Sequence, residues 1–372
     1  MRYELVIPTL LGIESVCARE VKRLGYDARC EDGRVIFEGG ADAVARTNIN
    51  IRSGERVLIR AAEFSAVSFE ELFENTKSIA WEEYIPLGYA FPVKGYSKKS
   101  RLASVPDCQA IIKKAVASRL GEKYGLEHIP EEEAVVRIQF SIMNDNVSLM
   151  IDTSGTPLYK RGYRTESNLA PLRETLAAAI VMLSFWKYET PLCDPFCGSG
   201  TIPIEAAMFK RNIAPGLNRS FASECFPYVS EQIWKNARDE ARDNIRSLPL
   251  EIYGGDIDED CIRMSGENAK RAGVSENIRF ERSRAENFAA MSDVGAIICN
   301  PPYGERLGEK RECYKLYSDI GKAFSKNKYW SEYILSSDED FEAHFGKKAS
   351  KRRKLYNGMI KCNLYQYFGD KK

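Results

Sequence analysis

Histidine is scarce in this sequence: only His128 and His344 occur among 372 residues. Two histidines leave few candidates for a histidine-based catalytic triad or a histidine-rich metal centre, so reactions that need no strong general base are favoured. The ten cysteines include no CxxC pair, which argues against structural zinc and is typical of reduced thiols. We therefore expect no metal in this protein.

The sequence also lacks an excess of either charge and lacks long apolar runs. Lysine and arginine number 54 against 53 aspartate and glutamate, so a nucleic acid would have to meet a local basic surface. No run of about 18 apolar residues occurs, and Glu4 and Pro8 make the N-terminus unlike a signal peptide. We expect a cytoplasmic protein with no membrane partner.

The secondary-structure signals change character along the chain. Up to about residue 155 they mix helix and strand in short α+β units, and TSGTPLYKRGYRTESN then reads as a linker. From Ala170 onward helices and strands alternate regularly, which predicts an α/β fold with a doubly wound parallel sheet. Its strands are expected at 192–194, 252–256, 278–282, 294–299 and 333–336.

Several local patterns give predictions that a structure can check. Ser68 with Glu71 predicts a capped helix running towards Trp81, and Gly25 is expected to end the first helix. We also predict a strand over Ala90–Gly95, a helix over Pro106–Tyr124, a hairpin turning at Asn144-Asp145-Asn146, and a closing hairpin turning at Lys361-Cys362-Asn363.

The segment Asp194–Thr201, DPFCGSGT, follows an apolar stretch and opens a helix, as the glycine turn of a nucleotide-binding fold does. Gly198 and Gly200 allow the backbone to approach a ligand where a Cβ would clash. Asp194 can accept a hydrogen bond from a cofactor ammonium group. The alternative is a tight turn with no ligand. A nicotinamide dehydrogenase is disfavoured, because Pro203 stands where its fingerprint has a third glycine.

A further acidic segment, Gly255-Asp256-Ile257-Asp258, ends the next predicted strand. An acidic side chain there can accept both ribose hydroxyls, and an apolar neighbour can pack against adenine. We predict Asp256 as the ribose ligand and Ile257 as the apolar neighbour. Asp258 is predicted as the N-cap of a helix over 259–272.

The segment Asn300–Arg306, NPPYGER, follows the apolar stretch Val294–Cys299. A planar amino group needs two acceptors aimed at its hydrogens and a face to stack on. The Asn300 side-chain oxygen and the Pro301 carbonyl can accept, and Tyr303 can supply the face; Asn300 is also expected to border the cofactor. The alternative is a proline-rich turn after a buried strand. Together the two motifs predict a nucleotide-like cofactor beside a planar nitrogen substrate.

These motifs resemble those of the THUMP-domain RNA methyltransferases, which place a methyl group from S-adenosylmethionine on guanine N2, and among them the bacterial large-subunit ribosomal RNA enzymes. Other matching stretches are Asp152-Thr153-Ser154-Gly155, KRGYR at 160–164 and APLRE at 170–174. The resemblance covers essentially the whole chain. It implies a ferredoxin-like domain at 1–65, a THUMP RNA-binding domain at 66–155, a linker at 156–168, and a Rossmann-like methyltransferase domain with a seven-stranded sheet at 169–372.

Carried over by position, the resemblance also implies roles for single residues. Asp194, Gly198 and Gly200 would hold the methionine end of S-adenosylmethionine, Asp256 its ribose, and Asn168–Glu174 would lie beside its carboxylate. Asn300, Pro301 and Tyr303 would hold a guanine of 23S ribosomal RNA, free or within an assembling ribosomal particle. Where the family often has an acidic or amide residue near the adenine, this chain has Ser283-Arg284-Ala285-Glu286, so no side chain is assigned there.

Other acceptors also suit an NPPY loop. Adenine N6 in DNA and a protein glutamine amide both offer planar amino groups, although Gly304-Glu305-Arg306 and the RNA-binding-like first half argue against them. A non-catalytic RNA-binding factor is a further alternative, and binding of S-adenosylmethionine would discriminate against it.

Basic clusters are the candidates for contact with RNA phosphates. Lys160, Arg161 and Arg164 border the predicted linker and cleft, and with Arg306 they form the predicted RNA-binding set. For the remaining two basic clusters, contact with phosphates and plain solvent-exposed charge are equally good interpretations. The first cluster comprises Lys94, Lys98, Lys99, Arg101, Lys113 and Lys114, and the second comprises Lys347, Lys348, Lys351, Arg352, Arg353 and Lys354.

Overall fold

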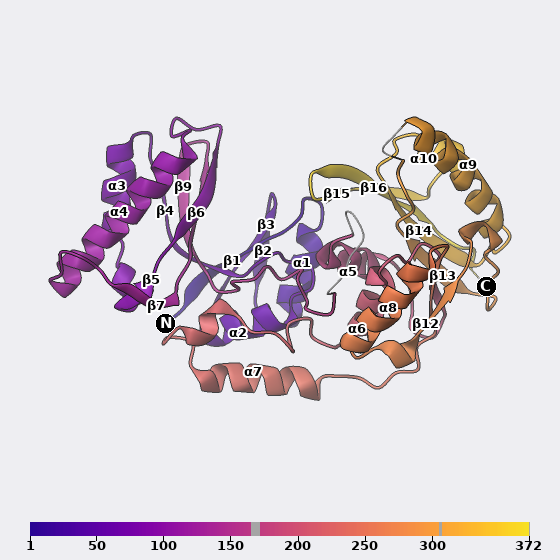
Figure 1. The fold of residues 1–372 in the computed structure, drawn as a ribbon, viewed down its shortest axis with the longest axis horizontal. Helices are drawn as coiled ribbons and strands as arrows, with labels where there is room; N and C mark the ends of the chain where they lie inside the picture. Colours follow the sequence, from indigo (N-terminus) through magenta and orange to yellow (C-terminus); the bar gives the residue numbers. More distant parts are fainter. Residues whose placement is uncertain (165–171, 305–306, 372) are drawn as a thin grey trace.

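The computed structural model describes residues 1–164, 172–304 and 307–371, and its first half is built on a seven-stranded mixed sheet (Figure 1). The strands lie in the order β2-β3-β1-β4-β9-β8-β6. Their bounds are Tyr3–Pro8 (β1), Ala28–Glu31 (β2), Arg34–Gly39 (β3), Leu58–Ser65 (β4), Val93–Lys98 (β6), Ile138–Met143 (β8) and Asn146–Asp152 (β9). Because β4 pairs with both β1 and β9, the segments predicted as ferredoxin-like and THUMP share this sheet.

Helices cover one face of that sheet. They are α1 (Glu14–Arg23), α2 (Ala41–Asn50), α3 (Phe69–Lys77) and α4 (Val105–Tyr124). Their apolar sides pack with inward strand residues such as Leu5, Ile59 and Leu149 into one core. On the opposite face only a small apolar cluster forms, from Val6, Ile36, Leu58 and Met150. This second face has no helix in the described part of the chain packed across it.

The local predictions for this half are largely confirmed. Ser68 caps α3 by accepting from the Glu71 N–H, Gly25 adopts a positive φ of 91°, and Asn144 and Asp145 turn the β8–β9 hairpin with positive φ angles. Two predictions were wrong. The helix after Ser68 ends at Lys77, and Trp81–Glu83 forms a separate 3-10 turn. The strand over Ala90–Gly95 is broken into β5 (Gly88–Ala90) and β6, because Pro92 lacks the N–H that a continuous ladder needs.

The second half is built on another seven-stranded sheet, in the order β12-β11-β10-β13-β14-β16-β15. Its strands are Leu192–Asp194 (β10), Ile252–Asp256 (β11), Ile278–Arg282 (β12), Gly295–Cys299 (β13), Trp330–Ser336 (β14), Lys351–Asn357 (β15) and Ile360–Tyr367 (β16). All pairs are parallel except those of β16, which is antiparallel to both neighbours. The predicted Rossmann-like seven-stranded sheet is confirmed. The closing hairpin turns at Gly358, whose φ is 63°, and not at residues 361–363 as predicted.

Helices lie on both faces of this second sheet. Residues of α5 (Glu174–Leu183), α6 (Thr201–Lys210) and α8 (Glu259–Arg271) pack into one core. Residues of α9 (Leu307–Phe324) and α10 (Phe341–Phe345) pack on the other face. The first residues after β10, β11 and β13 therefore meet at one edge of a doubly wound sheet, where such folds bind ligands.

A segment of the second half packs against the first. The helix α7 (Glu231–Asp243) lies along α2, and its Trp234 stacks on Phe221 within the N-terminal core. Arg46 of α2 donates two hydrogen bonds to Glu240 of α7, at 2.7 and 2.8 Å. Figure 1 shows α7 running alongside the N-terminal half before the chain returns to the second sheet. None of the helices in the described ranges combines the length and apolar character needed to cross a bilayer.

Candidate active site

The glycine turn after β10 is held in a shape that only glycine adopts easily. Gly198 and Gly200 have φ angles of 50° and 81°, in the left-handed region. A Cβ on Gly200 would lie 2.9 Å from the Cβ of Ser265 in α8, so the turn also packs closely against that helix. Helix α6 begins directly after it at Thr201, and no side chain caps its first turn. The predicted strand–turn–helix arrangement is confirmed.

Asp194 ends β10 and is buried, with 1% of its surface exposed. Its carboxylate accepts a hydrogen bond of 3.1 Å from the N–H of Phe196. Burial raises the pKa of the Asp194 carboxyl well above its usual range, and the Asp256 carboxylate adds to the rise. A cationic ligand in contact with this carboxyl would offset the cost of burying its charge.

Asp256 ties the end of β11 to the glycine turn. One carboxylate oxygen accepts from the N–H of Gly198 at 2.9 Å, and the other accepts from the N–H of Asp258 at 3.0 Å. Each oxygen keeps further acceptor capacity for a ligand hydroxyl. Asp258 accepts from the N–H of Asp260 at 2.9 Å, which confirms it as the N-cap of α8. Between them Ile257 is 53% exposed, unusual for a large apolar side chain beside a cavity.

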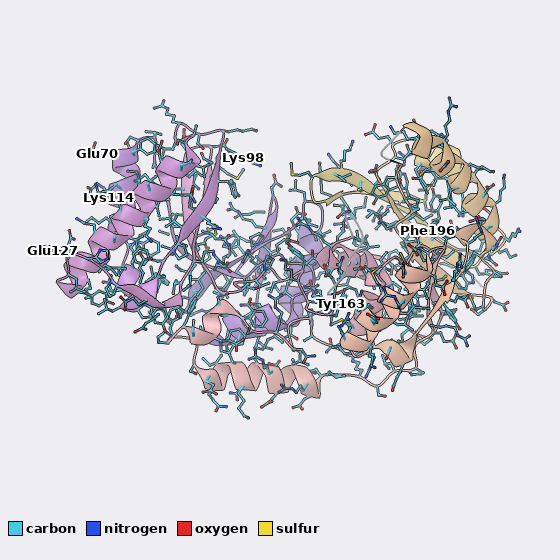
Figure 2. All side chains as sticks on the ribbon, in the orientation of Figure 1. Glu70, Lys98, Lys114, Glu127, Tyr163 and Phe196 are labelled. Atoms are coloured by element: carbon cyan, nitrogen blue, oxygen red, sulfur yellow. The ribbon has the colours of Figure 1, made fainter. Side chains whose placement is uncertain are left out.

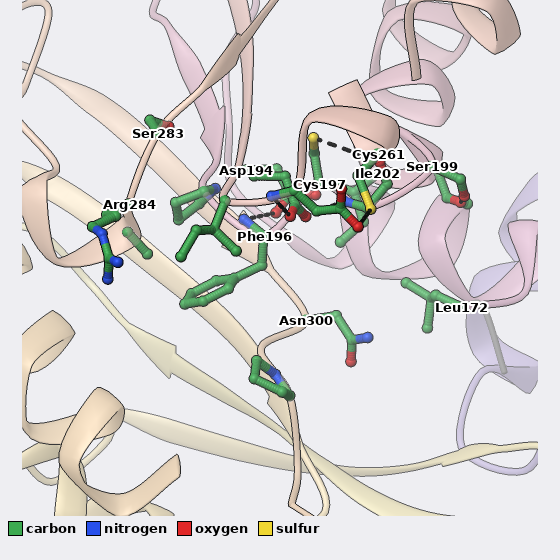
Figure 3. Close-up of a pocket in the computed structure, with 18 of the residues that line it drawn as sticks. Leu172, Asp194, Phe196, Cys197, Ser199, Ile202, Cys261, Ser283, Arg284 and Asn300 are labelled. Atoms are coloured by element: carbon green, nitrogen blue, oxygen red, sulfur yellow. Dashed lines mark hydrogen bonds between the residues drawn. The ribbon is translucent and has the colours of Figure 1, made fainter. Parts of the chain in front are cut away.

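A cavity of about 530 Å³ opens at this edge of the sheet (Figure 3). It brings together predicted residues from three separate segments, namely Asp194, Gly198, Asp256, Ile257 and Asn300. The stretch Ser283–Glu286, to which no role was assigned from the sequence, also lines it, as do Leu172, Cys261 and Leu316. Gly200 is not in the lining and supports the turn from behind. The cavity is therefore long enough to span from the glycine turn to the end of β12.

The loop after β13 forms a wall between this cavity and another one. Asn300 and Pro302 line the first cavity, whereas Tyr303 and Gly304 line a neighbouring cavity of about 490 Å³. The Tyr303 hydroxyl donates a hydrogen bond to the side-chain oxygen of Asn300. Burial raises the pKa of that hydroxyl well above its usual range, so it stays protonated as a donor. Pro301 itself is buried within the wall.

The neighbouring cavity is lined by the ends of β14 and β16 as well as by the loop. Its remaining described lining residues are Lys310, Tyr314, Ser337, Asp338, Glu339 and Ile360. His344 stacks on Tyr314 with ring centroids 3.7 Å apart and lies 3.3 Å from the Asp338 carboxylate. This cavity offers both aromatic and hydrogen-bonding surface next to Tyr303.

A residue that sequence reasoning missed holds the loop from behind. Tyr317 of α9 is fully buried, and its hydroxyl donates to the Pro302 carbonyl at 2.7 Å. No motif or spacing in the sequence distinguishes it from the other apolar-face residues of α9. The thiols beside the two motifs, Cys197 and Cys299, are both buried, and Cys197 also lines the first cavity.

The predicted RNA-binding set is only partly placed on the surface. The Arg161 side chain is 1% exposed and lies 3.4 Å from the buried Glu205 carboxylate, so the prediction of an RNA contact there is corrected. Arg164 is 9% exposed and pairs with Glu174 at 2.7 Å, which corrects it likewise. Both arginine side chains point inward because each forms an ion pair with a buried carboxylate. Lys160 is exposed and remains a prediction, while Arg306 and residues 165–171 lie outside the described residues.

Family models match the chain in successive segments. A model described as an RMKL-like methyltransferase domain matches residues 161–366, more than half of the chain. A model for the RlmL ferredoxin-like domain matches residues 4–58, and a THUMP domain model matches residues 66–152.

Individual relatives agree with those matches. YpsC of Bacillus subtilis, an inferred RNA methyltransferase, is 45% identical over 99% of this chain and 96% of its own length. A ribosomal RNA large subunit methyltransferase K/L of Vibrio cholerae is 33% identical over 96% of this chain but 52% of its own length. This chain thus spans about half the length of the K/L relatives it matches.

Solved structures share the whole architecture. SMU.472, described as a methyltransferase by inference and solved in complex with SAH, is 42% identical with a TM-score of 0.95 over 100% of this chain and 99% of that one. A protein of Listeria monocytogenes, described as a predicted N6-adenine-specific DNA methylase, is 46% identical with a TM-score of 0.95 over 100% of this chain and 97% of that one. The names of the relatives therefore agree on methyl transfer and differ on the acceptor.

Proposed function

This chain belongs to the RMKL-like family of S-adenosylmethionine-dependent methyltransferases with ferredoxin-like and THUMP domains, and we propose that it methylates the N2 amine of a guanine in 23S ribosomal RNA. The proposal rests on relatives in this family that are named as RNA methyltransferases. The guanine, its N2 position and the ribosomal substrate are the parts to be tested. The observation that supports them is the arrangement of the loop after β13. Asn300 lines the cofactor cavity, and Tyr303, which donates a hydrogen bond to Asn300, lines the neighbouring cavity.

The first cavity fits the cofactor. Asp194, buried and with a raised pKa, would accept from the ammonium of the methionine part. The uncapped first turn of α6 would attract the carboxylate, because the N–H groups at a helix N-terminus favour negative charge. Asp256 would accept from the ribose hydroxyls, and the exposed Ile257 would cover adenine. When bound, S-adenosylmethionine supplies an electrophilic methyl group.

The loop residues would orient the acceptor amine. In the proposal the base enters the cavity that Tyr303 lines and stacks on its ring. The Asn300 side-chain oxygen has a second lone pair besides the one engaged by the Tyr303 hydroxyl, so it can also accept from the amine. The Pro301 carbonyl would accept the second amine hydrogen. With both hydrogens held, the nitrogen lone pair points at the methyl group, and positioning can lower the barrier by as much as ~7–11 kcal/mol.

No strong base is needed for this reaction. The amine attacks as a neutral nucleophile, a new N–C bond forms as the methyl–sulfur bond breaks, and the cationic product then releases a proton to water. This agrees with a chain that has only two histidines.

The test is identification of the product. Unmodified ribosomal RNA is incubated with the full chain and labelled S-adenosylmethionine, then digested to nucleosides and analysed by mass spectrometry. The proposal predicts N2-methylguanosine. Label in duplex DNA as N6-methyladenine, or in protein as methylglutamine, would keep the cofactor site and replace the acceptor. Failure to bind S-adenosylmethionine at all would point to a non-catalytic RNA-binding factor.

A further inference from the structure

The loop after β14 runs beside the loop that carries Asn300. Strands β13 and β14 are parallel, and Cys299 pairs in register with Ile334. The residues that follow these two strands therefore leave the sheet at the same edge. Tyr303 follows Cys299 in one loop, and Asp338 follows Ile334 by the same number of residues in the other. Both Tyr303 and Asp338 line the neighbouring cavity of about 490 Å³, so an acidic side chain shares this cavity with the residue proposed to stack on the base.

The Asp338 carboxylate is held in one orientation. One of its oxygens accepts from the N–H of Asp340 at 3.0 Å, and the other lies 3.3 Å from Nδ1 of His344. The His344 ring is fixed in turn by stacking on Tyr314, with the two ring planes 15° apart. The Tyr365 hydroxyl donates to the backbone carbonyl of Asp338 at 2.9 Å. Because a carboxylate has about four acceptor positions, the two side-chain contacts leave capacity for a ligand in the cavity.

The next residue, Glu339, also lines this cavity but is a poorer acceptor for a ligand. Its side chain is 76% exposed and forms an ion pair of 2.8 Å with Lys361, whereas the Asp338 side chain is 14% exposed. A long exposed side chain loses conformational entropy when it is fixed against a ligand. Of these two carboxylates, Asp338 is therefore the preorganised one.

We propose that Asp338 is a specificity-determining residue, whose carboxylate accepts a hydrogen bond from the N1–H of the target guanine. This role rests on the proposed function, because it requires a guanine whose N2 amine is held at Asn300. In guanine, N1 and N2 are both bonded to C2 and lie on the same edge of the base. An acceptor in the loop beside Asn300 therefore meets the N1–H when Asn300 meets the amine.

The same contact excludes adenine. Adenine has a lone pair at N1 in place of the N–H, so a carboxylate at that position would be repelled and would lose its partner. A site built to accept from a substrate N–H rejects an analogue that lacks it, because its own polar group is then left unpaired. Asp338 thus gives the loop after β13, which suits any planar amine, a means of choosing between the purines.

The contact would also promote the transfer itself. As the methyl group moves to the amine, positive charge develops on N2 and is shared through C2 with N1. A fixed carboxylate at the N1–H stabilises that charge where it forms, and it needs no reorganisation to do so.

The selection of the base belongs to the catalytic half of the molecule. Figure 2 shows Phe196, which lines the cofactor cavity, in the catalytic half, and Lys98 and Lys114 in the N-terminal half. A test of Asp338 therefore compares rates of transfer with RNA already bound, so that changes in RNA affinity do not enter.

The experiment compares two bases at the position where N2-methylguanosine is mapped. Ribosomal RNA is assembled by splinted ligation with either guanosine or 2-aminopurine riboside at that position. 2-Aminopurine keeps the N2 amine, but it has a lone pair at N1 and lacks O6. Single-turnover rates of methyl transfer are measured for the full chain at saturating RNA and labelled S-adenosylmethionine. The readout is the rate with guanosine divided by the rate with 2-aminopurine.

The unmodified protein is expected to favour guanosine by about tenfold or more, and Asp338→Asn should lower this ratio about tenfold. The amide still accepts from the Asp340 N–H, and its amino group can donate to the N1 lone pair of 2-aminopurine. The loss of O6 affects every variant alike. Asp340→Asn is the matched control, because it makes the same change of charge at an exposed residue outside the described lining of the cavity. Its ratio should equal that of the unmodified protein.

An unchanged ratio in Asp338→Asn, with N2-methylguanosine still formed, would overturn the role of Asp338 and leave the proposed function standing. A ratio that falls in Glu339→Gln and not in Asp338→Asn would overturn it as well. If Asp338 only shaped the turn before α10, both rates would fall together and the ratio would stay constant. Absence of N2-methylguanosine with the unmodified protein would reject the proposed function and this role together. Thermal unfolding and affinity for S-adenosylhomocysteine confirm that each variant is folded with an intact cofactor site.

Discussion

The Tyr317 hydroxyl donates a hydrogen bond of 2.7 Å to the Pro302 carbonyl, and so fixes the loop that carries Asn300. Removing only that hydroxyl, in Tyr317→Phe, should let the loop shift without opening a cavity. Because small displacements of positioned groups can cost about 100-fold in rate, we expect kcat to fall roughly ten- to 100-fold. Cofactor affinity, measured by calorimetry with S-adenosylhomocysteine, should stay unchanged.

The matched control for Tyr317→Phe is Tyr333→Phe. Tyr333 is also fully buried in the catalytic half, and its hydroxyl accepts from the Phe185 N–H at 2.9 Å, away from the loop. Both variants should lose similar stability, about 1 kcal/mol for one hydrogen bond. If kcat fell equally in both, the effect of Tyr317 would be one of general stability.

The Asp256 carboxylate should be needed for cofactor binding more than for the chemical step. Its replacement in Asp256→Ala removes acceptors for the ribose hydroxyls and also releases the Gly198 N–H. Loss of a charged hydrogen-bonding group corresponds to about 10- to 150-fold weaker binding. Asp258→Ala, which removes the cap of α8 at a neighbouring position of the cavity lining, should cost about 1 kcal/mol of stability and weaken cofactor affinity less than Asp256→Ala does. Unchanged affinity in Asp256→Ala would mean that another group holds the ribose.

Arg161 should be important for stability. Its guanidinium donates to the carbonyls of Leu158 and Arg52 and lies against Glu205, all within the interior. Arg161→Met would leave the buried Glu205 carboxylate without its cationic partner, although the Tyr163 hydroxyl still donates to it at 3.1 Å, and loss of the cation costs about 3–5 kcal/mol. Urea unfolding measures this loss. The exposed Lys160 gives the contrast, since Lys160→Ala should leave the free energy of unfolding nearly unchanged; equal losses in both variants would argue against the buried pair.

Glu332 gives stability a specific pH dependence. Burial raises its pKa from 4.5 to about 7, with Lys347 only partly opposing the rise. In the unfolded chain the carboxyl ionises near its ordinary pKa. The contribution of Glu332 to the free energy of unfolding is therefore complete below about pH 4.5 and is lost as the pH rises to about 7. The loss is on the order of 3 kcal/mol. Glu332→Gln lacks this titrating group, so its free energy of unfolding in urea should increase relative to that of the unmodified protein between pH 5 and pH 8. A constant difference in the free energy of unfolding across that range would contradict the account.

Patterns local in sequence were enough to predict the catalytic sheet and its turn. The strand before Asp194, the positive φ of Gly198 and Gly200, and the capping by Asp258 each depend on a few neighbouring residues. Contacts between distant segments could not be predicted in the same way. Periodicity shows that α7 is amphipathic, but nothing in the sequence shows that its Trp234 packs on the N-terminal core.

The misassigned arginines have the same cause. The run KRGYR at 160–164 looks like a phosphate-binding segment, because charge is visible in sequence and burial is not. Glu205, which turns Arg161 inward, lies 44 residues further along the chain. Likewise, the separation of Lys98 from Lys114 onto opposite sides of a sheet follows from the strand and helix that carry them.

The central claim is that the Asn300 side chain orients the acceptor amine, and one variant tests it most directly. Single-turnover methyl transfer to unmodified ribosomal RNA and affinity for S-adenosylhomocysteine are measured for Asn300→Ala. We predict that transfer falls by about 100-fold or more, as when a single oriented hydrogen-bonding group is removed from an active site, while affinity changes by less than about threefold. Transfer at the rate of the unmodified protein, or a loss explained entirely by weaker cofactor binding, would contradict the account.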